Sequence, residues 1–417
     1  MLPVVRRAGL GGMVALLRDA PWLDRDRAKV YAWLLAIFMA IALLYGWSTA
    51  YLGHHVGAPA PIAAAAGKPQ PVDFVAFWSA GRLAAQGRPQ AAYDLNAISG
   101  QEHAAAALAP DVTLPFFYPP PFLVVCVPFA LLPYFGGFLA FVAAQMAALL
   151  AVLRRIEPAG WGWLPLLAFP GLLINAATGQ NGCITATLFA LPVLLLDRQP
   201  FLAGLCFGGL VYKPQLALCV PVALLAARRW RAVAGAALSS VLIVLLSLAI
   251  FGTGAWWAFL HAARLAQSGL ADNRAGWNNL QSLFAAARLA GAPVWLAYGL
   301  QAVLAATVLA ALALIARRRP GGGAEAALVS AAAVLCTPYV LDYDLALAGA
   351  PLAWLAARAQ RGGWLPWEKL LCGAAFLWPL VARQASARAG LPLGPLILLG
   401  LFAMVARRAW AGSRSAG

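Results

Sequence analysis

Residues 118–155 read YPPPFLVVCVPFALLPYFGGFLAFVAAQMAALLAVLRR, and this stretch decides how the chain crosses a membrane. Its apolar part is long enough for two short helices or one full span. Lys and Arg favour the cytoplasmic side of membrane proteins, and Arg154 and Arg155 close the stretch. A chain that enters from outside keeps them cytoplasmic with one crossing but not with two. We therefore expect a span at 135–153 and place 118–133 along or into the outer interface, where three consecutive prolines disfavour an ordinary helix start.

The composition indicates that lipid is the solvent of most of the chain. Of 417 residues, 63% are hydrophobic and 11% charged, and the mean hydropathy is +0.78. Soluble domains carry roughly a quarter charged residues. The net charge of +16 would otherwise suggest a nucleic-acid partner, but Lys and Arg lie in short clusters between apolar runs. We expect an all-α integral membrane protein that contacts membrane lipids and no nucleic acid.

The basic clusters also determine whether an even or an odd number of spans lies between them. All are expected to be cytoplasmic, so an even number of spans separates neighbouring clusters. The clusters are the N-terminal group ending at Arg27 and Lys29, then Arg154 and Arg155, Arg228–Arg231, Arg317–Arg319, Arg358 and Arg361, and Arg407 and Arg408. The prediction is about 12 transmembrane helices. They lie at 30–51, 135–153, 163–177, 181–196, 200–213, 215–227, 232–251, 293–316, 323–337, 343–357, 366–382 and 390–406. Several are shorter than the roughly 20 residues of a straight span, so short or tilted helices are expected there.

This topology predicts one transmembrane domain with two cytoplasmic ends. Residues 1–29 form a cytoplasmic N-terminal segment, residues 30–406 the transmembrane domain and residues 407–417 a cytoplasmic tail. The domain has outer loops at 52–134 and 252–292, which face the periplasm if the chain lies in a bacterial inner membrane. No loop motif of one half recurs in the other, whereas many secondary transporters have internal repeats.

Half of the acidic residues gather on the predicted outer side. Of the 14 Asp and Glu residues, those outside are Asp73, Asp94, Glu102, Asp111, Asp272, Asp342 and Asp344, and the four histidines His54, His55, His103 and His261 are outside too. Ionisable groups at membrane depth cost about 2.5–3.5 kcal/mol each and mark functional sites. The six cysteines lie in apolar segments without CxxC spacing, so no metal site and no cofactor are expected.

The first outer loop contains VDFVAFWSAGRLAAQGRPQAAYDLNAIS at residues 72–99. The pattern predicts an amphipathic interfacial helix at Trp78–Ala85, with Phe77 and Trp78 as interfacial anchors and Arg82 near lipid headgroups. Asp73 precedes this helix and has two interpretations. It is either a helix N-cap or a general base that takes a proton from an incoming hydroxyl.

Two predicted outer turns also carry candidate binding residues. Lys213 either extends to the membrane interface or pairs with a donor phosphate. Gln180 and Asn181, in the turn TGQNG, are either ordinary turn residues or sugar-binding groups at a polar cavity.

Two later segments carry candidates with an equally plain alternative. In the second outer loop we weigh a solvated loop against phosphate or sugar contacts from His261, Arg264, Asn278 and Asn279, with His261 favoured because imidazole can contact phosphate. In TPYVLDYDLAL, Asp342 and Asp344 either cap a helix or border the site.

Five motifs in order carry a family resemblance: DFVAFWSAGRL with a following YD, then FYPPP, TGQN, YKPQL and RRW. Together they resemble the polyprenol-phosphate-mannose-dependent mannosyltransferases, glycosyltransferase family 87 of the GT-C superfamily, over residues 73–344. The resemblance implies a GT-C-like bundle with juxtamembrane helices in the first outer loop and a lipid-phosphate sugar as donor. It also implies an acidic base in the first outer loop, which corresponds to Asp73. Among the motif residues, we expect Tyr118 and Lys213 at the donor.

The expected function is therefore a membrane hexosyltransferase. It would transfer a hexose, mannose above all, from a polyprenyl-phosphate donor to a lipid or glycan acceptor at the periplasmic face, with inversion and Asp73 as general base. The alternative is a multi-pass transporter or a lipid or glycolipid flippase. That class favours internal repeats and polar residues at mid-bilayer, whereas this sequence concentrates polar residues at the outer edge.

Overall fold

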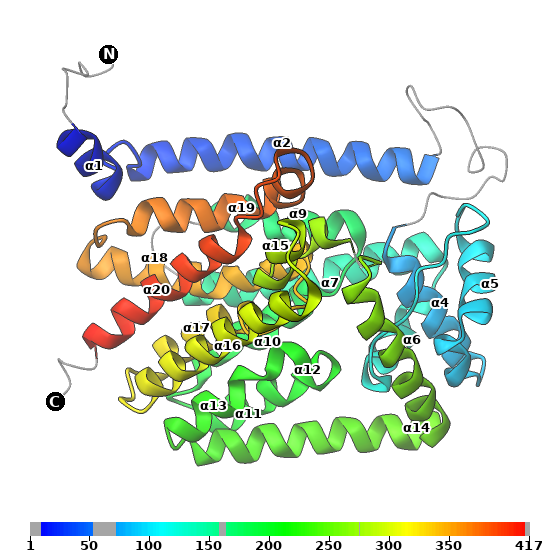
Figure 1. The fold of residues 1–417 in the computed structure, drawn as a ribbon. Helices are drawn as coiled ribbons and strands as arrows, with labels where there is room; N and C mark the ends of the chain where they lie inside the picture. The colour runs from blue at the N-terminus through cyan, green and yellow to red at the C-terminus, as the bar shows by residue number, and fades with distance from the viewer. Residues whose placement is uncertain (1–9, 53–71, 158–163, 275, 413–417) are drawn as a thin grey trace.

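The computed structural model describes residues 10–52, 72–157, 164–274 and 276–412, and these are helical apart from turns, loops and one isolated bridge between Leu280 and Leu341 (Figure 1). The α-helices are α1 Leu10–Asp19, α2 Arg25–Leu52, α4 Phe74–Ala85, α5 Leu95–Ala105, α6 Pro120–Ala130, α7 Tyr134–Ile156, α8 Leu164–Leu167, α9 Pro170–Thr178, α10 Gly182–Leu195, α11 Pro200–Gly208, α12 Pro214–Ala217, α13 Cys219–Ala226, α14 Trp230–Ala271, α15 Leu283–Leu289, α16 Val294–Ala316, α17 Gly322–Ala333, α18 Gly349–Gly362, α19 Glu368–Ala389 and α20 Gly394–Gly412. The 3-10 helices are η1 Pro89–Tyr93, η2 Gly209–Tyr212, η3 Trp277–Asn279 and η4 Asp342–Ala348. His54 and His55, which the topology predicts on the outer side, lie outside the described residues.

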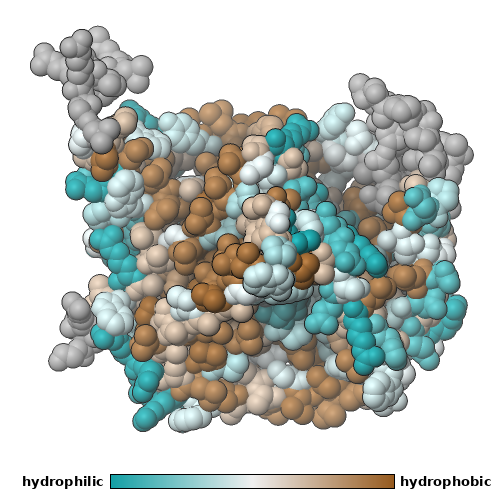
Figure 2. Space-filling model, in the orientation of Figure 1, coloured by the Kyte–Doolittle hydropathy of each residue, from teal (hydrophilic) through white to brown (hydrophobic). Residues whose placement is uncertain are grey.

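In the described part, six helices are long and apolar enough to cross a membrane: α2, α7, α14, α16, α19 and α20. Each overlaps one predicted span, although α19 and α20 begin and end later than predicted. Figure 2 shows hydrophobic residues over the middle of one face and hydrophilic residues gathered toward its left and right edges. The structure thereby confirms an all-helical chain with the features of a multi-pass membrane protein.

The other predicted spans are short or broken helices. Between α7 and α14 the chain forms α8 to α13, of which the apolar stretches Gly182–Leu195, Pro200–Tyr212 and Pro214–Ala226 are under 18 residues each. Prolines explain several of the breaks, because Pro170, Pro200 and Pro214 each stand in the first turn of a helix, where a missing N–H costs nothing.

The two ends of the bundle differ in what they carry. In Figure 1, α1 and the last turns of α20 lie at the left, whereas α4, α5 and α6 lie at the right. We call the end that carries α4, α5 and α6 the outer end. This arrangement agrees with an even number of crossings between the two ends of the described chain.

The prolines of residues 118–133 do not prevent a helix, contrary to the prediction. Pro120 and Pro121 form the first turn of α6, and the helix accommodates Pro128 further along. Proline suits the first turn because its fixed φ matches the helix and its missing N–H has no partner there. α6 packs against α4 in the outer end rather than forming a second span.

The predicted interfacial helix starts four residues earlier and is mostly buried. α4 begins at Phe74, and Phe77 is 2% exposed in an aromatic cluster, so Phe77 is not an interfacial anchor. Trp78 donates its indole N–H to the Leu132 carbonyl at 3.0 Å. The amphipathic prediction failed because small residues on the other face of α4, such as Gly81, allow α6 to approach closely.

The second predicted outer segment, residues 252–292, is largely helical. α14 runs on to Ala271, with a break at Gly252, whose φ of 72° and ψ of 173° are not helical. Such a backbone is essentially restricted to glycine. After this break, α14 turns toward α6, as Figure 1 shows, and packs on η1 and α6.

Candidate functional site

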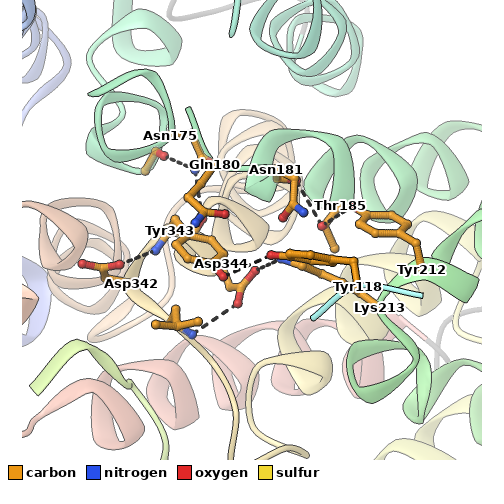
Figure 3. A network of polar contacts seen from close by, with 12 residues as sticks. Tyr118, Asn175, Gln180, Asn181, Thr185, Tyr212, Lys213, Asp342, Tyr343 and Asp344 are labelled. Atoms are coloured by element: carbon orange, nitrogen blue, oxygen red, sulfur yellow. Dashed lines mark hydrogen bonds and ion pairs between the residues drawn. The ribbon is translucent and has the colours of Figure 1, made fainter. Parts of the chain in front are cut away.

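Polar side chains from distant segments meet in one network (Figure 3). They come from the residue before α4, the segment before α6, the turn between α9 and α10, the break before α12, and η4. Those labelled in Figure 3 are Tyr118, Asn175, Gln180, Asn181, Thr185, Tyr212, Lys213, Asp342, Tyr343 and Asp344. Seven predicted site residues thus belong to one neighbourhood: six of these and Asp73, which contacts Gln180.

The turn between α9 and α10 brings Gln180 to Asp73. Gly179 ends α9 with a φ of 68°, in the left-handed region that favours glycine. A Cβ on Gly179 would lie 2.6 Å from the Cβ of Phe74, the residue after Asp73. The Gln180 amide Nε2 then donates to Asp73 Oδ2 at 3.1 Å. The glycine of the TGQN motif is therefore what allows this close approach.

Asp73 does not use its carboxylate as a helix cap. It stands at the N-cap position of α4 but makes no side-chain capping bond, and among the described residues its carboxylate is hydrogen-bonded only by Gln180. Burial raises the pKa of Asp73, while the Gln180 hydrogen bond and the charge of Arg383 act in the opposite direction. The hydrogen bonds of Asp73 therefore do not support its interpretation as a helix N-cap.

Lys213 and Asp344 form a buried ion pair. Lys213 Nζ lies 2.7 Å from Asp344 Oδ1, and both side chains are 3% exposed. The ammonium also lies 4.8 Å from the ring centroid of Tyr343 and 5.8 Å from that of Tyr118. Extension of Lys213 to the membrane interface is thus wrong, because the break between η2 and α12 directs the side chain inward.

Asp342 and Arg383 form a second ion pair, which is half open. Arg383 Nη2 lies 2.8 Å from Asp342 Oδ2, and the Arg383 side chain is 49% exposed. The other oxygen of Asp342 accepts the Tyr343 N–H, and Asp344 Oδ2 accepts the Leu341 N–H. Each aspartate accepts a backbone N–H at the start of η4 and also forms an ion pair with Lys213 or Arg383. Capping of the helix is therefore only part of their role.

The two pairs leave one carboxylate without a cation. Lys213 is matched with Asp344 and Arg383 with Asp342. Within the described ranges, no Lys, Arg or His nitrogen lies within salt-bridge distance of Asp73. An Asp that is partly buried, held by a neutral amide and not paired has a lone pair available to accept a proton.

Several buried amides point to a polar ligand. In the part of the chain that the structure describes, both side-chain polar atoms of Asn181, Oε1 of Gln180 and Oδ1 of Asn175 have no hydrogen-bond partner. Asn181 is 0% exposed. Buried polar groups are normally satisfied, and each exception asks for an explanation such as an absent water or ligand.

The remaining predicted residues lie elsewhere. Arg82 approaches the Ala130 carbonyl at 3.4 Å. Arg264 is exposed on α14, and His261, on the same helix, lines a hollow away from Lys213. Asn278 and Asn279 lie in η3, which the bridge between Leu280 and Leu341 places beside the segment that leads into Asp342.

Sequence reasoning missed the residues that support the site. Arg383 had a usable signal, because it lies with Arg388 in a predicted outer turn, outside the predicted cytoplasmic clusters. Asn175 gave no such signal, yet its amide holds the Tyr343 carbonyl at 2.9 Å. Thr185 and Tyr212 bond through their hydroxyls at 2.6 Å, and both looked like ordinary residues of apolar helices.

Comparison with known proteins identifies the family of the chain. No curated protein and no solved structure matches it significantly. Residues 116–338 match the model of glycosyltransferase family 87, in agreement with the resemblance of the sequence motifs. The match includes Tyr118, Gln180, Asn181 and Lys213, whereas Asp73 lies before it. Because the match covers more than half of the sequence, the chain belongs to glycosyltransferase family 87.

Proposed function

We propose that this protein transfers a hexose, with mannose as the expected sugar, from a polyprenyl-phosphate donor to a hydroxyl of a lipid or glycan acceptor. Family membership makes it a glycosyltransferase rather than a transporter. In this proposal the outer end faces the periplasm of a bacterial inner membrane, with both chain ends cytoplasmic. The long and short apolar helices together form a GT-C-like bundle of about 12 crossings.

The observation that carries the mechanism is the carboxylate of Asp73, which forms no ion pair with any of the described residues. A general base needs an available lone pair and a pKa shifted toward working pH. The cations of the site hold Asp342 and Asp344, so the proton-accepting role is assigned to Asp73. The Gln180 amide fixes the orientation of the carboxylate from one side and leaves its other oxygen for the acceptor.

The proposed reaction is a single displacement. The acceptor oxygen attacks the anomeric carbon as Asp73 removes the hydroxyl proton, so a new glycosidic bond forms with inversion. The bond between the anomeric carbon and the phosphate oxygen breaks, and polyprenyl phosphate leaves with the electron pair. No other reactant is required.

The leaving phosphate needs positive charge, and two cations are available to it. Arg383 is half exposed and engages Asp342 through Nε at 2.9 Å and Nη2 at 2.8 Å, so its outer edge remains open to a ligand. Its charge also acts on the pKa of Asp73. A guanidinium is suited to bidentate phosphate binding. Lys213 has three N–H donors, of which Asp344 takes one.

The unpartnered amides fit the sugar of the donor. Asn181 and Gln180 precede the N-terminus of α10, and their free polar atoms face the same neighbourhood as Lys213 (Figure 3). An amide offers both donors and an acceptor, which suits sugar hydroxyls that act as both. We therefore propose that Gln180 and Asn181 bind hydroxyls of the hexose and that Tyr118 lines the space around it.

The test is turnover by the purified protein in lipid nanodiscs. With polyprenyl-phosphate mannose as donor and a membrane-lipid extract as acceptor, the wild type should release polyprenyl phosphate. Asp73→Asn should lower the rate by about 10²–10⁴-fold. Asp111→Asn, which removes an exposed carboxylate of the same outer segment, should leave the rate unchanged. Retention of most of the rate by Asp73→Asn would refute the assignment.

A further inference from the structure

A hollow on the outer end lies apart from the network around Asp73. It has a volume of about 370 Å³ between η1, the start of α5, the segment before α6 and the outer part of α14. Its lining consists of Gln90, Ala92, Tyr93, Asp94, Leu95, Ile98, Pro115, Phe116, Phe117, Ala258, His261, Ala262 and Leu265. Nothing in the proposed mechanism uses this hollow.

The lining combines aromatic rings with hydrogen-bonding side chains. Tyr93, Phe116 and Phe117 supply aromatic surface, whereas Gln90, Asp94 and His261 supply polar atoms. A pyranose ring has C–H faces that pack on aromatic rings and hydroxyls that donate and accept hydrogen bonds. Small-molecule sites combine apolar walls with a few placed polar groups in this way.

A second hollow lies beside the first. This neighbour has a volume of about 720 Å³ and shares Gln90 and Asp94 with the first. Arg88 and Asn96 line it as well, so its wall is more polar. The two hollows, which we call the η1 groove, offer room for more than one sugar unit.

The chemistry of the η1 groove disfavours a phosphate and a lipid chain. The carboxylate of Asp94 lines both hollows and the guanidinium of Arg88 lines the second, so the groove has no excess of negative or positive charge to hold a charged ligand. Gln90, Asp94 and His261 are all exposed to solvent, so the groove would not shield a hydrocarbon chain. A neutral polyhydroxy ligand fits both conditions. His261 thus lines a different hollow from the network that holds Lys213, and its contact with the donor phosphate stays a prediction.

One aromatic layer separates the groove from the site. The Tyr93 hydroxyl donates to the Tyr118 carbonyl at 3.0 Å, and the rings of Phe116 and Tyr118 lie 5.7 Å apart. Tyr118 in turn contacts Tyr343 through the two hydroxyls at 3.4 Å. A ligand in the groove thus lies next to the site without reaching Asp73.

We infer that the η1 groove binds neutral sugar units of a glycan acceptor at a distance from the reacting hydroxyl, with Gln90 and His261 as hydrogen-bonding residues. This inference rests on the proposed function, since it specifies the acceptor class. Binding at a remote subsite holds the acceptor and adds to its affinity for the enzyme.

The binding test uses saturation-transfer NMR on the full-length protein in nanodiscs, with mannobiose, cellobiose and maltose as probes. We expect at least one disaccharide to bind the wild type. His261→Ala and Gln90→Ala should each weaken binding about threefold to tenfold, the loss of one or two hydrogen bonds. The control Gln267→Ala changes an exposed amide of α14 outside the groove and should bind like the wild type.

Two results would overturn the inference: no binding of any probe to the wild type, or equal binding by all variants. Unfolding is checked by the thermal midpoint, which should not change because both substituted side chains are exposed. Failure of the proposed function is a separate result. In that case the disaccharide binds as expected while Asp73→Asn leaves the release of polyprenyl phosphate unchanged.

Discussion

The amide of Gln180 donates to the carboxylate of Asp73 at 3.1 Å across a sequence separation of 107 residues. This bond stabilises the ionised form and lowers the pKa of Asp73, against the effect of burial. Gln180→Ala should therefore raise that pKa. Because a general base works only when ionised, the acid limb of the rate profile should move to higher pH. The measurement is kcat/KM for the donor from pH 4 to 8.

The double variant Asp73→Asn/Gln180→Ala separates this effect from general damage to the site. If Gln180 acts through the carboxylate, removing it from Asp73→Asn should cost much less than removing it from the wild type. An unmoved acid limb in Gln180→Ala would show that another group controls the pH dependence.

The buried pair of Lys213 and Asp344 should be sensitive to removal of either partner. Lys213→Met or Asp344→Leu alone leaves a buried charge without its counter-ion, which typically costs about 3–5 kcal/mol. The double variant should recover much of this loss because no charge remains. The thermal midpoint in detergent measures the three variants against the wild type.

Activity of that double variant tests whether Lys213 also serves the donor phosphate. Once stability has recovered, a purely structural pair predicts a near wild-type rate. A role in phosphate binding predicts a rate that stays low, with a raised KM for the donor. Equal stability of the single and double variants would contradict the pairing itself.

The six long apolar helices among the described residues were predictable because hydrophobic length can be read along the chain. The predicted spans 30–51, 135–153 and 293–316 lie in α2, α7 and α16. Short helices were harder, since a run such as 200–227 is apolar throughout and only packing decides where it breaks. The helical outer part of α14 was hidden by its polar residues, which look like a loop in sequence.

Site residues were predictable where a charged side chain stands beside an apolar segment, because burying such a charge costs free energy. Asp73, Lys213 and Asp344 are charged groups beside apolar segments, and all three reach the network. Their pairing was not predictable, because it depends on how η4 packs against the break before α12. Asn175 and Tyr343 resemble ordinary helix and loop residues, and their roles emerge only from contacts between distant segments.

Glu102 should make folding stability depend on pH. It is 0% exposed, and Oε2 accepts the Leu114 N–H at 3.0 Å. Burial raises its pKa to about 7 from 4.5. A raised carboxyl pKa means that the folded state prefers the neutral form. The contribution of Glu102 to stability is therefore greatest below about pH 4.5 and declines as the pH rises toward 7, by at most about 3 kcal/mol.

Glu102→Gln should remove that decline, because the amide oxygen still accepts the Leu114 N–H without a charge. Thermal midpoints between pH 4.5 and 8 should show the variant gaining on the wild type as the pH rises. Asp272→Asn, at an exposed carboxylate, is the control and should follow the wild type. Parallel curves for the wild type and Glu102→Gln would show that burial does not raise the pKa of Glu102.

Gly252→Ala should displace the outer part of α14 and with it the wall of the η1 groove. A Cβ at this position meets no atom within 4 Å, so the cost arises from the backbone alone. The φ of 72° and ψ of 173° suit only glycine, and a side chain there costs about 1–3 kcal/mol. The control Gly299→Ala, in the regular helix α16 and equally free of contacts, should be neutral or stabilising. Because His261 follows the break, Gly252→Ala should also weaken disaccharide binding, and unchanged binding with an unchanged thermal midpoint would show that the break does not depend on glycine.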